Sequence, residues 1–232
     1  MEAWIEFARG PLFAFAMLIF LLGMGRHVLL QTHALLAGKG RRLRQVSWRR
    51  TMLDSLSWAV PVRHMVRGTI FISATSFLFH VGAVLVPLFA PGHIVLWERF
   101  LGAALPSLDR SFADVLTLTT VVCCVLMLSY RAVIRRARDL SRPSDYVLLV
   151  LVLLPFASGY LAAHPQYSPL SWNGMLLVHL LSAELLLIAA PFTKLSHIVL
   201  FVFDRLSVVH WQFRPGAGER VAEALFGEEA RV

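Results

Sequence analysis

Nine histidines are the residues of this chain most suited to chemistry, and several of them fall inside long apolar segments. An ionisable side chain at membrane depth is costly and marks a functional site. The neutral imidazole nitrogen is a frequent ligand of haem iron. A haem held between two membrane helices needs one histidine on each helix at matching depth. The histidines therefore indicate haem chemistry if the helices bring them together in pairs.

His179 and His197 lie 18 residues apart in the last apolar segment. On an uninterrupted helix this spacing is ~5 turns, so the two side chains would share one face and lie ~27 Å apart along the axis. Pro191 lies between them and predicts a kink that changes these values modestly. The segment therefore offers one candidate ligand near each membrane surface.

His80, in the second apolar segment, is the predicted partner of His197 at the cytoplasmic side of the membrane. Gly82 beside it would ease the close approach of a macrocycle. The alternative for all the intramembrane histidines is hydrogen bonding between helices without a cofactor. Four further histidines are interpreted as interfacial or surface residues: His27, His33, His64 and His210.

His93 suits the depth of His179 as its partner near the outer surface. On a straight second helix, however, His93 would be rotated by ~220° from the inner candidate and would face away. A helix break at Pro87 or at Pro91 would redirect it. His164, at the outer end of the fourth segment, is the rival partner of His179.

The composition describes a membrane domain, because 57% of the residues are hydrophobic and 16% charged, with a mean hydropathy of +0.67. Apolar runs of ~20 residues cross a membrane as helices. We expect one all-α domain over residues 1–232, with transmembrane helices over about 11–36, 69–90, 112–130, 145–163 and 172–203. Cys123 and Cys124 are adjacent in an apolar run and are interpreted as packing residues, not as a disulfide or a metal site.

Basic residues gather in alternate connections, over 37–68 and 131–144. The positive-inside rule places both loops and the tail over 204–232 in the cytoplasm, and the N-terminus outside. The loops serve topology and lipid contact, or alternatively dock a cytoplasmic partner. No aromatic-interleaved platform favours nucleic acid. The loop residues are Lys39, Arg41, Arg42, Arg44, Arg49, Arg50, Arg63 and Arg67 in the first and Arg131, Arg135, Arg136, Arg138 and Arg142 in the second.

The segment from His179 to His197, with Pro-Phe-Thr-Lys at 191–194, resembles the last helix of the respiratory nitrate reductase gamma subunit. The Leu-Phe-His80-Val-Gly stretch is similar to the inner-haem ligand region of that family. The family's outer ligand follows ten residues later, where this chain has Ala90. The stretch His93-Ile-Val-Leu-Trp-Glu looks more like cytochromes in the transmembrane redox complexes of sulfur and sulfate metabolism, which accompany iron–sulfur proteins resembling heterodisulfide reductase.

This resemblance implies a di-haem cytochrome b of the bacterial inner (cytoplasmic) membrane. Two non-covalent haems b would be ligated by His80 with His197 and by His93 with His179. Lys194, one turn before the last ligand, would meet haem propionates or extend to the lipid headgroups. Electrons would pass between a quinone, such as menaquinone, and a cytoplasmic iron–sulfur subunit, in either direction.

Polar residues near the outer ends of the second and third segments are candidates for the quinone and its protons, and their alternative is an interfacial role. Glu184 is a carboxylate inside the fifth segment, ~140° around the helix from His179, and would serve a proton path or pair with another helix. The outer candidates are Trp97, Glu98, Arg110 and Asp114.

Two other functions remain open at this point. A haem-free anchor or assembly subunit would dock a partner through the basic loops. A single-haem variant would use only the inner pair, His80 and His197. A transporter is disfavoured, because no pair of broken helices occurs in repeated halves.

Overall fold

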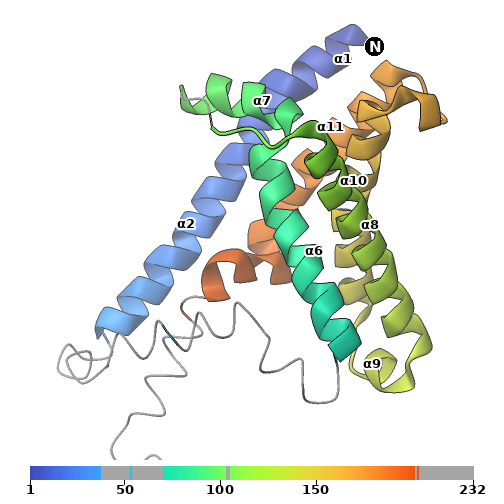
Figure 1. Ribbon diagram of the computed structural model, residues 1–232. Helices are drawn as coiled ribbons and strands as arrows, with labels where there is room; N and C mark the ends of the chain where they lie inside the picture. Colours follow the sequence, from blue (N-terminus) through green and yellow to red (C-terminus); the bar gives the residue numbers. More distant parts are fainter. Residues whose placement is uncertain (38–52, 54–69, 103–104, 202, 204–232) are drawn as a thin grey trace, which may run out of the picture. The chain divides into compact units, whose positions relative to one another are not determined.

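The structure, a computed structural model, describes residues 1–37, 53, 70–102, 105–201 and 203. These residues form helices joined by short connections, and no β-strand occurs among them. In this part of the chain, five helical segments are long and apolar enough to cross a membrane: Glu2–Ala34, Ile70–Phe89, Arg110–Val133, Pro143–Ala163 and Trp172–Phe192. The predicted all-helical architecture with five spans is confirmed (Figure 1).

The chain divides into two compact units. The first consists of Met1–Leu18 and Pro61–Ile188, and the second of Ile19–Val60 and Ala189–Val232. The boundary falls within the first and last spans. The predicted basic loop at 37–68 and the tail at 204–232, with His64 and His210, lie outside the described residues apart from residues 37 and 53.

In the first unit, α8 packs against both α6 and α10. Gly82 on α6 faces Thr120 on α8, and a side-chain carbon at position 82 would collide with the threonine hydroxyl. The glycine therefore admits a neighbouring helix, not the macrocycle that the sequence suggested. Cys124 is buried and donates from Sγ to the Leu149 carbonyl at 3.2 Å, which fits its predicted packing role. The helices that begin or lie in this unit are α1 (Glu2–Phe7), η1 (Ala8–Leu12), α2 (Phe13–Ala37), α6 (Ile70–Phe89), α7 (Pro91–Leu101), α8 (Arg110–Val133), α9 (Arg135–Asp139), α10 (Pro143–Ala163), η2 (Pro165–Tyr167) and α11 (Trp172–Ala189).

The polar and apolar side chains are distributed as expected for a lipid-exposed bundle. On α8, Val115 and Val122 are 59% and 54% exposed, whereas Thr117 and Thr120 are buried. Both threonine hydroxyls donate to the carbonyl one turn earlier, at 2.7 Å, so burial leaves them satisfied. The bundle thus turns its apolar surface outward and its small polar groups inward.

The first helix begins earlier than predicted, at Glu2 instead of residue 11. The predicted span begins at Pro11 because the long apolar run begins there. In the structure Pro11 lies inside η1, a π-helical turn that continues directly into α2. A widened turn accommodates the missing N–H of proline without ending the helix.

The second span ends in a break that separates α6 from α7. Ala90 is extended, with φ −63° and ψ 139°, because the residue before a proline is driven out of the helical region. Pro91 then starts α7 and has no N–H for the Pro87 carbonyl. The indole of Trp97 donates to that carbonyl instead, at 3.0 Å, and so holds α7 against the end of α6.

The predicted continuous helix from residue 172 to residue 203 is wrong. α11 ends at Ala189 and is followed by η3 (Ala190–Phe192), by an extended Thr193 with ψ −177°, and by η4 (Lys194–Ser196). Pro191 interrupts the helix instead of kinking it, so the shared helix face of His179 and His197 does not exist. Within the second unit, His27 Nε2 lies 2.8 Å from the Pro191 carbonyl that the break leaves without a helical donor.

Candidate functional site

Two histidine side chains meet in the first unit, one from α7 and one from α11. The rings of His93 and His179 are almost parallel, with an interplanar angle of 6° and centroids 5.9 Å apart. Two imidazoles that bind one iron from opposite sides, each nitrogen ~2 Å from the metal, have centroids about 6 Å apart. The observed centroid distance matches two imidazoles on one metal ion, and it also matches an offset aromatic pair.

Both rings are held by the same kind of backbone contact. His93 Nδ1 lies 3.1 Å from the Val86 carbonyl, and His179 Nδ1 lies 2.8 Å from the Pro155 carbonyl. Since a carbonyl can only accept, each Nδ1 carries the proton and each Nε2 offers its lone pair. No hydrogen bond to either Nε2 is recorded among the described residues. Histidines that bind metals usually show this arrangement.

Burial keeps His93 in the form that binds metals. Desolvation lowers the pKa of His93 from its usual value, against the opposing effect of the Val86 and Pro87 backbone contacts. Its ring therefore stays neutral at neutral pH, and only a neutral imidazole can donate a lone pair to iron. On a straight helix His93 would face away from the inner candidate. The helix break at Ala90 turns α7, and with it His93, in a different direction.

Gly159 on α10 lies directly beside the His179 ring. A side-chain carbon at position 159 would be 2.9 Å from Cε1 and 3.0 Å from Nδ1 of that ring. In the described part of the chain, no group of three or more His, Cys, Asp or Glu side chains could hold a metal ion by itself. Two histidines suffice only when another group supplies the remaining ligands, as a porphyrin does, and on this count the site fits a haem.

His164, the rival partner of His179, makes a different contact. Its Nε2 lies 3.2 Å from Asp114 Oδ2, and its Nδ1 lies 3.0 Å from the Tyr160 carbonyl. Both ring nitrogens are thus engaged with protein groups. This geometry favours His93 as the partner of His179.

The proposed inner ligands lie in different units, His80 in the first and His197 in the second. His80 Nδ1 is 2.7 Å from the Ser76 carbonyl, and His197 Nδ1 is 2.7 Å from the Lys194 carbonyl. Each ring therefore has the backbone contact that also holds the outer pair. Their pairing, and the contact of the Lys194 side chain with a propionate, stay predictions.

The predicted quinone residues fall into three separate groups. The Trp97 indole donates a hydrogen bond to the Pro87 carbonyl, and the Glu98 side chain is exposed on α7. Arg110 and Asp114 both contact the C-terminal end of α10: Arg110 Nη2 donates to the Ala163 carbonyl at 3.2 Å, and Asp114 approaches His164. No hydrogen bond or ion pair joins the first two to the last two within the described residues.

Glu184 is the third group and is 3% exposed in α11. Neither of its carboxyl oxygens has a hydrogen-bond partner among the described residues. The predicted pairing with another helix is thus not seen there. A carboxylate without partners is costly in an apolar interior, so the neutral acid is the favoured form.

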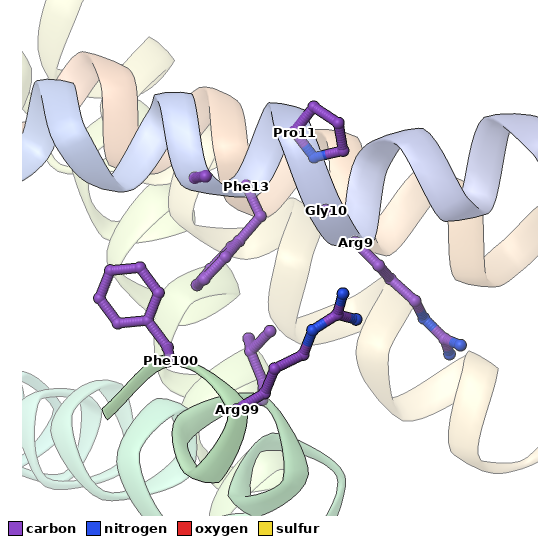
Figure 2. Close-up of a pocket in the computed structure, with 8 residues that line it drawn as sticks. Arg9, Gly10, Pro11, Phe13, Arg99 and Phe100 are labelled. Atoms are coloured by element: carbon purple, nitrogen blue, oxygen red, sulfur yellow. The ribbon is translucent and has the colours of Figure 1, made fainter. Parts of the chain in front are cut away.

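A pocket of about 400 Å³ lies between η1, the start of α2, and α7. Phe13 and Phe100 meet edge to face across it, with centroids 5.8 Å apart, and Figure 2 shows Arg99 reaching towards the helix that carries Arg9. Leu96 and Phe100 follow His93 by three and seven residues, so the pocket borders the side of α7 that bears this histidine. The lining residues are Arg9, Gly10, Pro11, Phe13, Ala14, Leu96, Arg99 and Phe100.

Sequence reasoning missed Gly159, Arg9 and Arg99 as site residues. A glycine inside an apolar run gives no sign of which side chain it faces. The two arginines lie 90 residues apart, so nothing local in the sequence brings them to one pocket. Their position beside apolar runs, outside the two basic loops, was the available signal.

One relative places the chain in a family. A protein of Nitratidesulfovibrio vulgaris (strain Hildenborough), whose recorded name is simply "Protein", is 35% identical over 208 residues, covering 86% of this chain and 89% of the relative. No protein-family model matches the chain, and no solved structure matches it. At this identity and coverage, the chain belongs to the same family as the N. vulgaris protein.

Proposed function

We propose that this chain is a di-haem b-type cytochrome subunit of a bacterial cytoplasmic membrane, which transfers electrons between the quinone pool and an iron–sulfur partner. The observation that carries the proposal is the parallel pair of His93 and His179, with both Nδ1 atoms on backbone carbonyls. The five spans support a multi-pass membrane location, and the relative comes from a bacterium.

His93 and His179 would hold the outer haem, and His80 and His197 the inner one. A bound haem supplies one-electron chemistry through its iron. The protein contributes neutral imidazoles, fixed ring orientations and an apolar environment. The carbonyls of Val86 and Pro155 raise the basicity of the ligating nitrogens through their hydrogen bonds to Nδ1.

The pocket beside α7 supports a quinone as the membrane-soluble substrate. Its volume of about 400 Å³ falls within the range of ligand sites, and its aromatic walls match an aromatic headgroup. The guanidinium groups of Arg9 and Arg99 can donate hydrogen bonds to quinone carbonyl oxygens. Its position next to the His93 side of α7 would place the substrate near the outer ligand pair.

The basic connection between α8 and α10, at the C-terminal end of α8, supports the docking of a protein partner. Arg135, Arg136 and Arg138 lie in α9, and all three are exposed. Such a surface favours an acidic partner through electrostatic steering. An iron–sulfur subunit docked there would exchange electrons with the inner haem.

The test is a haem determination on the purified membrane protein, with a pyridine haemochrome spectrum and stoichiometry. We expect about two haems b per chain. His93→Ala and His179→Ala should each remove the same haem, and His80→Ala and His197→Ala the other. His33→Ala, an exposed histidine on α2, is the matched control and should change nothing.

Each alternative has its own result. A ratio near one that only the inner variants abolish would identify a single-haem cytochrome. No haem, under conditions that load other cytochromes, would refute the proposal and leave a membrane anchor with basic loops.

A further inference from the structure

A histidine and a carboxylate form an ion pair at the end of α10, outside the candidate haem ligands. His164 Nε2 lies 3.2 Å from Asp114 Oδ2 on α8. The His164 ring also stacks on Tyr160, with centroids 4.3 Å apart and an interplanar angle of 24°, and Tyr167 lies 6.3 Å away. The ring is therefore held by aromatic contacts and by polar contacts at both nitrogens.

The contacts of this pair require one stored proton. The Tyr160 carbonyl, 3.0 Å from Nδ1, can only accept a hydrogen bond, and an ionised carboxylate can also only accept. A neutral imidazole has one N–H and satisfies one of the two. The second contact needs a further proton, shared between Nε2 of His164 and Oδ2 of Asp114.

The surroundings allow that proton to leave. The side chains of His164 and Asp114 are 17% and 30% exposed, so the pair is partly open to the surroundings of the protein. Tyr160 from α10 and Tyr167 from η2 contact the His164 ring, and Arg110 from α8 lies at the same end of α10. Arg110 donates to the carbonyl of Ala163, the residue next to His164.

The pair also lies close to the candidate outer haem ligands. Gly159, which abuts the His179 ring, precedes His164 by five residues on α10. Five residues span ~7.5 Å along a helix axis. His164 thus lies between one and two helical turns along α10 from the glycine that abuts the His179 ring.

We propose that His164 and Asp114 form a proton-transfer site, which carries protons between the quinone at the outer ligand pair and the aqueous phase. This inference rests on the proposed function. In each one-electron step of quinol oxidation a quinol O–H bond breaks, and the haem that His93 and His179 would hold would supply the electron acceptor. The proton binds at Nε2 of His164, after the previous proton has left to water. Quinone reduction runs the same steps in reverse.

The experiment measures reduction of the purified, haem-loaded protein by a short-chain quinol in single turnovers. His164→Gln and Asp114→Asn should each slow haem reduction by ~10²-fold, the lower range for general acid–base groups, without changing haem content or the absorption spectrum. Added imidazole should restore part of the rate in His164→Ala, an effect that a purely structural role would not produce. Ser111→Ala, at an exposed position on the first turn of α8, is the control and should keep the wild-type rate.

Unchanged rates in both variants would overturn the proton-transfer site while leaving the cytochrome intact. Loss of the outer haem in His164→Gln would also overturn it, because His164 would then be an iron ligand. If the wild-type protein binds no haem, the proposed function fails, and the stored proton is tested separately. Nitrogen-15 NMR of the His164 ring and the infrared carboxyl band of Asp114 would then locate it. If neither Nε2 of His164 nor the Asp114 carboxyl carries the stored proton at neutral pH, the inference is refuted.

Discussion

Gly159→Ala is the smallest change that should separate haem binding from folding. The added carbon would lie 2.9 Å from Cε1 of His179, whereas carbon atoms in ordinary contact are ~3.5 Å apart or more. The ring would have to move by about 0.6 Å. A ring without a metal can make this shift, but a ring bonded to an iron that is also held by His93 cannot do so freely.

The magnitude follows from the cost of overpacking, ~1–3 kcal/mol, which corresponds to roughly 5- to 150-fold weaker haem binding. The fold itself should not suffer, because alanine is favoured over glycine in a helix by ~1 kcal/mol. Position 159 lies inside α10, four residues before its last residue, so this gain applies there. The variant should therefore remain folded and lose the outer haem selectively.

Haem titration of the purified variant, followed by absorption and by thermal unfolding, measures both effects. Gly25→Ala on α2 is the matched control, because no atom lies within 4 Å of the added carbon. It should show the same helix gain and normal haem binding. If Gly159→Ala binds both haems with wild-type affinity, the His93–His179 pair does not hold a haem in this geometry.

Three further predictions concern packing and buried polar groups. Gly82→Ala should lower the thermal stability by ~1–3 kcal/mol through its collision with Thr120, and the double variant with Thr120→Ala should recover most of the loss; no recovery would mean that the two side chains do not meet. Trp97→Phe should cost ~1 kcal/mol or more in unfolding experiments, because the Pro87 carbonyl loses its donor, and an unchanged melting temperature would contradict this hydrogen bond. Glu184→Leu should raise the stability by ~1–3 kcal/mol, since it removes a buried carboxyl group without partners, whereas a less stable variant would reveal a partner.

The second, third and fourth spans were predicted from the sequence to within a few residues. The observed helices are Ile70–Phe89, Arg110–Val133 and Pro143–Ala163. Long apolar runs bounded by charged or proline-containing segments leave little choice in a membrane, where every backbone group must be paired within its own helix. The positive-inside orientation stays a prediction.

The three prolines at the ends of spans were harder to interpret. Pro11 lies inside a π-helical turn, Pro91 starts a new helix, and Pro191 interrupts one. Each removes a backbone N–H, but what happens next depends on whether another group supplies the missing donor. The Trp97 indole donates to the Pro87 carbonyl, which Pro91 leaves without its helical donor, and the His27 ring contacts the carbonyl of Pro191 itself. Neither contact follows from local sequence.

For the histidines, too, some features follow from the sequence and others only from the tertiary structure. Composition and the lengths of apolar runs were sufficient to place His93 and His179 within or beside membrane helices, because hydrophobic burial depends on the residues themselves. The approach of the two rings depends on the helix break at Ala90 and on the space left by Gly159. The engagement of His164 with Asp114 depends on the packing of α10 against α8. These contacts join residues far apart in the chain, so they follow from tertiary packing and not from local periodicity.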